Sequence, residues 1–181
     1  MVLETERLLL RPWAETDVED LYRYASDPQV GPAAGWPPHT SVENSREIIR
    51  DVLSEPGTFA VVLRATGEVI GSVGIMRAGG GTAPVEEDEA EIGYWIGRPF
   101  WGQGLIPEAV RTVERFCFEE LGCRRLWCGY YEGNEKSRRV QEKCGFVPHH
   151  TQENVRCKHL DECRTEHFTT LTREAWERAR I

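Results

Sequence analysis

The sequence lacks the features that mark membrane and nucleic-acid-binding proteins. No apolar run among its 181 residues approaches the ~20 residues that a transmembrane helix needs. Basic residues are outnumbered, with 22 Lys and Arg against 30 Asp and Glu, so the net charge is −8. This charge argues against attraction to nucleic acid or to an anionic membrane, and it favours a cationic partner. An anionic ligand would then have to be held by local groups.

A secretory signal is also missing. The first eleven residues carry acids at Glu4 and Glu6 and contain no small-residue cleavage site. We therefore expect a cytoplasmic protein. The length suits one globular domain over residues 1–181, and the pattern shows no repeat.

Paired cysteine motifs are absent as well. The six cysteines include no C-x-x-C pair, and a chain of this size without a signal is expected to keep them as free thiols. Cys157, His159, Cys163 and His167 lie close in sequence, but their spacing fits no common zinc pattern. We therefore expect no metal.

The periodicity of apolar residues predicts an α+β fold with the order β-α-α-β-β-β-α-β-α-β-β. About seven strands form a mixed, mostly antiparallel sheet, and about four helices flank it, with one parallel step across the helix at 105–121. The expected strands are 5–11, 58–64, 68–76, 90–97, 125–131, 146–156 and 164–171, and the expected helices are 16–26, 42–54, 105–121 and 134–144. Thr172 is expected to cap a further short helix.

Local motifs refine this outline. Thr16 followed by Glu19 predicts a capping box, and Ser41 is expected to cap the second helix. Residues 31–38, rich in Gly and Pro, predict an irregular loop that carries Trp36. The acidic run at 85–89 predicts a solvated hairpin tip, or alternatively a rim of the site that attracts cations.

The turn Trp101-Gly102-Gln103-Gly104-Leu105 lies between an apolar strand and the amphipathic helix at 105–121. Its glycines let backbone N–H groups approach a ligand, and the helix adds its positive dipole end, which together suit a pyrophosphate. The Gly-Lys-Ser/Thr of a Walker loop is absent, and Pro107 occupies the third glycine position of a dinucleotide-binding fingerprint. A purely structural turn remains an alternative for this segment taken alone.

A second segment, 134–146, follows the next expected strand and contains Asn-x-x-Ser and Glu-Lys-Cys-Gly-Phe. Together with Glu-Ile-Gly-Tyr-Trp-Ile at 91–96 and Trp-Gly-Gln-Gly at 101–104, it resembles the GNAT acetyltransferase superfamily. More narrowly, it resembles the RimJ/RimL-type branch, the ribosomal-protein N-terminal acetyltransferases. Glu-Thr-Glu-Arg-Leu at 4–8 and Leu-Thr-Arg-Glu-Ala-Trp at 171–176 extend the resemblance over nearly the whole chain.

The resemblance implies acetyl-CoA as co-substrate. It assigns the pyrophosphate to backbone amides of the turn and the pantetheine arm to the strand backbone and Asn134. The nucleotide phosphates are assigned to basic groups of the helix at 134–144. The implied cofactor-binding residues are Tyr94, Trp95, Ile96, Gly102, Gln103, Gly104, Leu105, Ile106, Asn134, Ser137, Arg138 and Lys143. One departure is Pro99, which stands where the superfamily usually has Gln or Arg, with Arg98 beside it as a substitute.

The resemblance also suggests how the chemistry is divided. Glu91 is the candidate general base, with a structural or rim carboxylate as the alternative role. The usual superfamily acid, a tyrosine seven residues after the asparagine, is replaced by Gln141, so Ser137 becomes the candidate acid. Helix capping or contact with pantetheine are its alternative roles. Trp36 is the candidate residue that lines the acceptor pocket, and a backbone amide near Trp95 is the candidate oxyanion donor.

The expected activity is transfer of acetyl from acetyl-CoA to a primary amine, which is a protein N-terminus or a small amine, by direct attack in a ternary complex. The alternative is an inactive acyl-CoA-binding sensor. Neither nucleic acid nor membrane is an expected partner, and the chain is expected to be a monomer or a homodimer.

Overall fold

The computed structural model describes all residues 1–181 and contains one sheet of eight strands. The strand order across the sheet is β1-β2-β3-β4-β5-β6-β8-β7. The strands are β1 Leu3–Glu4, β2 Leu8–Pro12, β3 Thr58–Leu63, β4 Val69–Met76, β5 Glu89–Ile96, β6 Arg125–Tyr131, β7 Val147–Cys157 and β8 Glu162–Thr172. All neighbours are antiparallel except β5 and β6, which confirms the α+β class and the single parallel step.

Six α-helices flank the sheet: α1 Val18–Ala25, α2 Gly31–Ala34, α3 Val42–Ile48, α4 Leu105–Glu119, α5 Glu135–Lys143 and α6 Arg173–Arg178. Short 3-10 turns lie at Glu15–Asp17 and Arg98–Phe100, and a π-helical turn, Ile49–Leu53, prolongs α3. The expected numbers, about seven strands and about four helices, were therefore slightly low, chiefly because two-residue β1 and four-residue α2 were not foreseen. No helix has the length and apolar character required to cross a bilayer.

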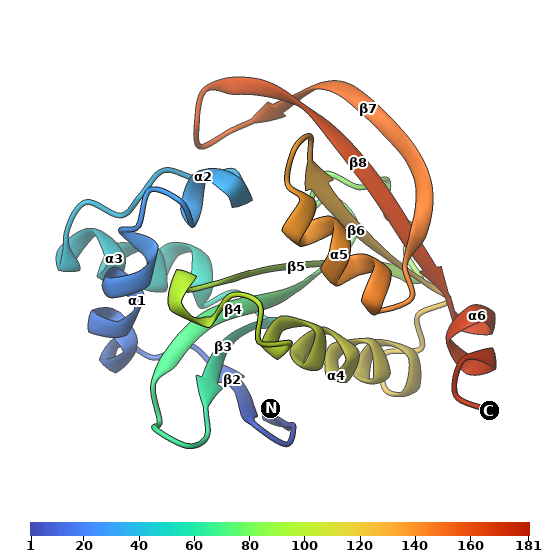
Figure 1. Cartoon of the computed structure of the whole chain (residues 1–181), viewed down its shortest axis with the longest axis horizontal. Coiled ribbons are helices and arrows are strands. Elements are labelled where there is room, and N and C mark those ends of the chain that lie inside the picture. The colour runs from blue at the N-terminus through green and yellow to red at the C-terminus, as the bar shows by residue number, and fades with distance from the viewer.

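The core lies on both faces of the sheet. The larger apolar cluster joins the sheet to α4 through Val110, Val113 and Phe118, which are almost fully buried. Leu8 and Leu10 on β2 belong to this cluster. On the other face, α1 and the π-helical turn after α3 pack in a second cluster with Ala60, Val62 and Val69. Figure 1 shows α4 and α5 in front of the sheet, with α1, α2 and α3 gathered at one side.

The sheet splits in the middle, and the split positions the site. β5 and β6 are paired only where Glu89–Glu91 face Arg125–Trp127, and beyond these residues the two strands diverge. Figure 1 shows β5 running toward α2 while β6 runs toward the β7–β8 hairpin. The backbone of β5 beyond Glu91 therefore has no strand partner on the side that faces β6.

Two local predictions were wrong: contacts of the neighbouring Asp17 decide the first segment, and tertiary contacts decide the second. Thr16 caps no helix: the Asp17 carboxylate accepts a hydrogen bond from the Ala14 N–H and pairs with Arg11, so a 3-10 turn precedes α1. Within 31–38, residues Gly31–Ala34 form α2, whose carbonyls accept hydrogen bonds from Arg164 and from Asn134. These long-range donors complete a turn that Pro and Gly alone do not specify.

Other local predictions were confirmed. Ser41 and Thr172 each accept a hydrogen bond from a first-turn N–H of the helix that they cap. All six cysteines are free, and five of them are buried. Glu86, Glu87 and Asp88 of the acidic run are exposed in the loop that joins antiparallel β4 and β5, as the solvated hairpin tip requires, and Glu86, Asp88 and the buried Glu89 pair with Arg124.

Candidate active site

The turn at 101–104 and the start of α4 have the backbone arrangement of an anion cradle. Gly102 and Gly104 both have φ of +74°, a conformation that favours glycine, and Gly104 is the N-cap of α4. The backbone N–H groups of residues 102–106 donate no backbone hydrogen bond. The turn itself is held by Gln103, whose amide nitrogen donates to the Pro99 carbonyl at 3.0 Å. Free N–H groups at a helix N-terminus suit a phosphate group.

The cationic side chain near this cradle is not the one expected from the sequence. Arg98 does not stand in for the missing residue at Pro99, because its guanidinium pairs with Asp27 at 2.8 Å. Sequence reasoning missed Lys136, whose ammonium lies 3.6 Å from the centroid of the Trp101 ring. The cradle therefore has a cation that comes from α5.

Strand alternation decides which β5 amides face the split. The Gly97 N–H donates to the Ile70 carbonyl on β4. Because alternate residues of a strand direct their backbone groups to opposite sides, those of Trp95 point toward β4, and those of Tyr94 and Ile96 point toward the split. The Ile96 carbonyl accepts a hydrogen bond from the Trp101 indole at 3.0 Å. The backbone groups that can contact a ligand in the split are those of Tyr94 and Ile96, so Trp95 is not the residue that offers its amide.

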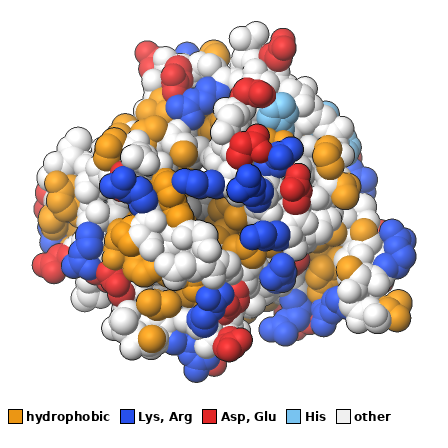
Figure 2. Space-filling model, in the orientation of Figure 1, with side chains coloured by type: hydrophobic (Ala, Val, Ile, Leu, Met, Phe, Trp, Pro, Cys, Tyr) orange, Lys and Arg blue, Asp and Glu red, His pale blue; other side chains and the backbone are white.

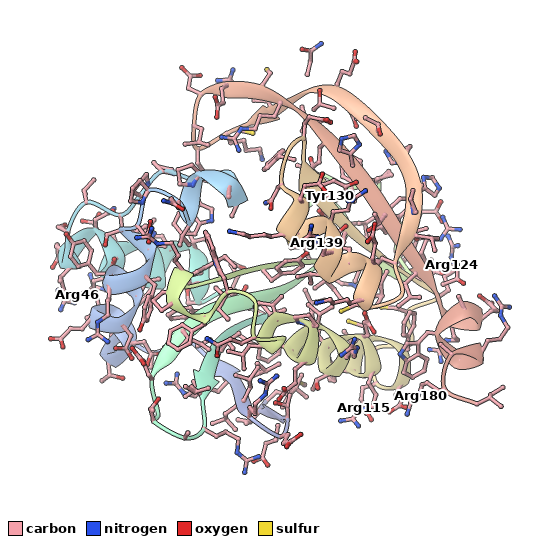
Figure 3. All side chains as sticks on the ribbon, in the orientation of Figure 1. Arg46, Arg115, Arg124, Tyr130, Arg139 and Arg180 are labelled. Carbon is pink, nitrogen blue, oxygen red and sulfur yellow. The ribbon has the colours of Figure 1, made fainter.

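A hollow lies over this part of β5. Figure 2, drawn in the orientation of Figure 1, shows it near the centre of the face, with apolar side chains inside it and Lys and Arg side chains around it. Arg139, labelled in Figure 3, lies on α5 on the same face. The acidic chain thus presents local positive charge beside the anion cradle.

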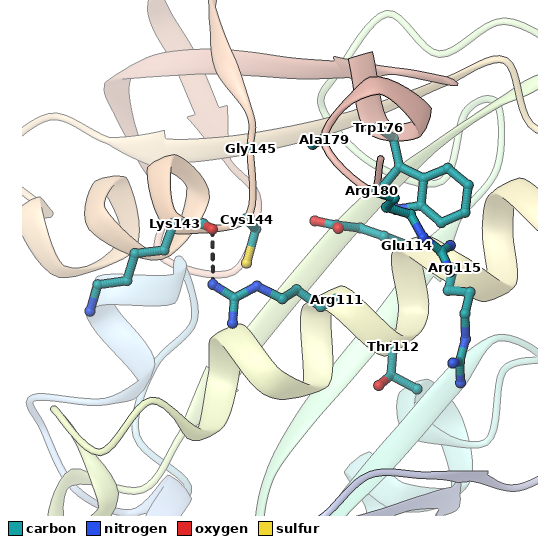
Figure 4. Close-up of a pocket in the computed structure, with 10 residues that line it drawn as sticks. All are labelled: Arg111, Thr112, Glu114, Arg115, Lys143, Cys144, Gly145, Trp176, Ala179 and Arg180. Carbon is teal, nitrogen blue, oxygen red and sulfur yellow. Dashed lines mark hydrogen bonds between the residues drawn. The ribbon is translucent and has the colours of Figure 1, made fainter. Parts of the chain in front are cut away.

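The two predicted phosphate-binding side chains of α5 lie in different surroundings. Arg138 pairs with Glu135 at 2.9 Å and approaches Glu142 at 3.8 Å, so its charge is already matched. Lys143 has no ion-pair partner and borders a cavity of about 420 Å³ between α4, α5 and α6. Figure 4 shows Arg111 reaching from α4 to the Lys143 carbonyl, at 3.0 Å.

Asn134 and Ser137 lie at the start of α5. Asn134 is its N-cap and accepts a hydrogen bond from the Ser137 N–H at 3.2 Å, while its own amide nitrogen donates to Ala33 on α2. Ser137 is half-buried, and its hydroxyl lies 2.8 Å from the Tyr94 hydroxyl. The sequence indicated a role only for the backbone of Tyr94, but the structure places its phenol beside the candidate acid.

Glu91 lies at the closed end of the split, on the face opposite α4, because its neighbours Ala90 and Ile92 pack in the α4 core. Its side chain is only 5% exposed and accepts a hydrogen bond from the Ala83 N–H at 3.0 Å. Burial raises the pKa of Glu91, although hydrogen bonds from Ala83 and Thr82 oppose the shift. A carboxyl group with a raised pKa is suited to accept a proton near neutral pH.

Glu166 is a second buried carboxyl group on this face, and nothing in the sequence singles it out. Thr82 donates to its Oε1 at 2.9 Å, while its Oε2 has no hydrogen-bond partner. Burial, with a contribution from the charge of Glu91, raises the pKa of Glu166 to about 7. β8 carries this residue beside Gly129 of β6, which links it to the split.

Trp36 lies on the same side of the sheet as Glu91. Its ring packs edge-on against Trp95 of β5, with centroids 5.5 Å apart, and Trp13 stacks on Trp95 from another direction at 6.5 Å. Both Trp36 and Trp95 are half-buried. The aromatic groups thus form an apolar wall beside the split.

Comparisons with known proteins agree with this geometry. The family model described as an acetyltransferase (GNAT) domain matches residues 7–147. An uncharacterized N-acetyltransferase p20 of Bacillus licheniformis is 36% identical over 129 residues, covering 68% of this chain and 70% of the relative. The putative ribosomal N-acetyltransferase YdaF of Bacillus subtilis is 48% identical over 59 residues, about a third of each chain.

A solved structure shows the same fold. AAC(6')-Ib, in complex with ribostamycin and coenzyme A, superimposes with a TM-score of 0.76 at 19% identity, covering 97% of this chain and 99% of the other. The split sheet, the glycine turn at the start of α4 and the family match converge. The chain belongs to the GNAT family and is an N-acetyltransferase.

Proposed function

We propose that the protein transfers acetyl from acetyl-CoA to a primary amine by direct attack within a ternary complex. The observation that carries this proposal is the placement of two groups at the split: Glu91 on one face of the sheet and Ser137 on the other. A thioester that enters between β5 and β6 would meet a proton acceptor on the acceptor side and a hydroxyl on the α5 side.

Acetyl-CoA would bind along the surfaces described above. The amides of residues 102–106 would hold the pyrophosphate, since they have no internal partner. The pantetheine arm would lie along the backbone of Tyr94 and Ile96 and beside Asn134. Lys143 and Arg111, at the cavity between α4 and α5, would meet the nucleotide phosphates.

The chemistry then follows from the charges. The acceptor ammonium must lose a proton before it attacks, and Glu91 takes it directly or through water. The oxyanion of the tetrahedral intermediate needs a donor, which the N–H of Ile96 or Tyr94, the residues that flank Trp95, would supply. Ser137 donates a hydrogen bond to the departing sulfur.

The proposed acceptor is a protein N-terminus, on the basis of one relative and of the aromatic wall. The similarity to YdaF, named a putative ribosomal N-acetyltransferase, favours a protein N-terminus. The aromatic wall of Trp36 and Trp95 suits an apolar residue beside such an amine. A small amine is the second class to be tried.

The test combines calorimetry with thiol release. We expect acetyl-CoA to bind, and at least one member of a panel of N-terminal peptides and small amines to release CoA thiol. Glu91→Gln and Ser137→Ala should lower thiol release by about a hundredfold while acetyl-CoA still binds. Glu87→Gln, an exposed acid of the neighbouring loop, is the matched control and should behave as the wild type.

Two outcomes contradict the proposal. Failure to bind any acyl-CoA removes the donor assignment. Binding without thiol release for every amine supports an acyl-CoA sensor instead.

A further inference from the structure

The hydroxyl groups of Tyr94 and Ser137 belong to a longer hydrogen-bonded chain under α5. They lie 2.8 Å apart, and Gln141, one turn further along α5, approaches the Tyr94 hydroxyl at 3.2 Å and the Ser137 hydroxyl at 3.3 Å. Thr169 on β8 closes the chain, with its hydroxyl 2.7 Å from the Gln141 side-chain oxygen. Figure 1 shows α5 lying over β5 and β6, where these groups meet.

The Gln141 amide has a defined direction. Thr169 donates to its oxygen, and its nitrogen donates to the Gly129 carbonyl at 2.9 Å. Gln141 is 1% exposed, so no water competes for these bonds. An amide nitrogen donates and does not accept, so its second hydrogen must point at the pair of hydroxyls. Neither hydroxyl can give its own hydrogen to Gln141.

The two hydroxyl hydrogens of Tyr94 and Ser137 then have only two possible arrangements. The 2.8 Å contact between the two hydroxyls uses one hydrogen and leaves one over. If Tyr94 supplies the shared hydrogen, the Ser137 hydrogen is free to point into the split. If Ser137 supplies it, the Tyr94 hydrogen turns to the Ser137 carbonyl at 3.2 Å. A negative sulfur in the split selects the first arrangement, because a charged acceptor makes the stronger hydrogen bond.

We propose that Tyr94, Gln141 and Thr169 are positioning residues that direct the Ser137 hydroxyl as a hydrogen-bond donor toward the departing CoA sulfur. The inference rests on the proposed function of Ser137. When the carbon–sulfur bond of the intermediate breaks, its electron pair stays on sulfur, which accepts the Ser137 hydrogen bond. Donors from Tyr94 and Gln141 onto the Ser137 oxygen strengthen that bond.

The hydrogen-bonded chain stands in for a tyrosine that the sequence lacks. The tyrosine expected seven residues after Asn134 is Gln141 here, and a phenol reaches the same region from β5 instead. Burial raises the pKa of Tyr94, so its phenol stays protonated and keeps its role as a donor.

The test uses Tyr94→Phe and Thr169→Val, with Thr169→Ser as the conservative control that keeps a hydroxyl. We expect both disruptive variants to lower kcat about tenfold and to leave the Kd for acetyl-CoA within about twofold. Thr169→Ser should recover most of the wild-type kcat. Equal losses in Thr169→Ser and Thr169→Val, or an increase in Kd that accounts for the loss, would overturn the inference.

A double-mutant cycle separates positioning from general support of the fold. In the Ser137→Ala background, Tyr94→Phe and Thr169→Val should cause no further loss of kcat, because the hydroxyl they direct is gone. A further tenfold loss there would show that they act elsewhere. Should Thr169→Val fail to fold, the Tyr94→Phe cycle gives the same decision.

The same data distinguish the two proposals. A wild-type protein that transfers no acetyl contradicts the proposed function. An active wild type whose Ser137→Ala variant is equally active contradicts the role of Ser137. An active wild type with a slow Ser137→Ala variant and a normal Tyr94→Phe variant contradicts only the positioning chain.

Discussion

Glu114 on α4 is a buried carboxyl group without a partner, and its replacement should stabilise the protein. It borders the cavity between α4, α5 and α6 shown in Figure 4, is 2% exposed, and its Oε1 has no hydrogen-bond partner. Burial raises the pKa of Glu114 to about 8, and Arg111 offsets the shift only in part. The group therefore stays protonated in the folded protein at neutral pH.

The raised pKa of Glu114 makes the free energy of unfolding depend on pH. The folded pKa of Glu114, about 8, lies above the ordinary value of 4.5, so the unfolded chain ionises first. Its contribution to stability is fully present below about pH 4.5 and is lost as the pH rises toward 8. At about 1.4 kcal/mol per pKa unit, the loss at pH 7 is about 3 kcal/mol.

Glu114→Gln keeps the shape of the side chain and removes the ionisation. Since the amide also lacks partners, we expect it to recover only part of the loss, about 1–2 kcal/mol, which raises Tm by about 3–7 °C for a chain of this size. The gain should be small at pH 5 and larger at pH 8, as measured by urea and thermal unfolding at both values.

The control is Glu120→Gln, an exposed acid near the end of the same helix. Its effect on the free energy of unfolding should be small and equal at pH 5 and pH 8. The reasoning fails if Glu114→Gln differs from the wild type by the same amount at both pH values, or if it is the less stable protein at pH 8.

Three further substitutions test the split and the turn. The charge of Glu91 contributes to the raised pKa of Glu166, so Glu91→Gln should lower the pKa of Glu166, as followed by NMR titration; an unchanged pKa would show that the two groups are uncoupled. Gly81→Ala would place a Cβ 2.0 Å from Oε2 of Glu91, and we expect it to destabilise the fold by about 1–3 kcal/mol in urea unfolding and to slow acetyl transfer. In Gly74→Ala, the matched control, the nearest atom lies 3.8 Å away, so stability should be almost unchanged. Gly104→Ala forces φ of +74° on alanine and should cost about 1–2 kcal/mol and weaken acetyl-CoA binding in calorimetry; unchanged affinity would argue against the cradle.

Some parts of the fold are predictable because neighbouring residues decide them. The apolar stripe of the 105–121 segment, with Ala109, Val110 and Val113, is buried as its 3.6-residue period requires. Leu8 and Leu10 alternate into the core as a strand requires. Ser41 caps its helix through a hydrogen bond that spans only three residues. In each case the information is local.

Distant contacts account for what the sequence did not reveal. α2 depends on donors more than a hundred residues away in the chain, which complete its turn. Thr16 is an exception, because it loses its capping role through contacts near in sequence, in which Asp17 is engaged by Arg11 and by the Ala14 N–H. Arg98 is drawn to Asp27 and so does not serve as the substitute expected beside Pro99.

By itself, the sequence determined the family, most of the order of elements and the glycine turn before α4, because these depend on local periodicity and on motifs. It also identified Glu91 and Ser137 as candidate groups. Only the tertiary structure decided what surrounds them: Tyr94 and Gln141 beside Ser137, and Glu166 on the face of Glu91. The reason is physical. Strands β5, β6 and β8 meet only when the sheet forms, and burial there sets both the directions of the hydrogen bonds and the pKa values of the carboxyl groups.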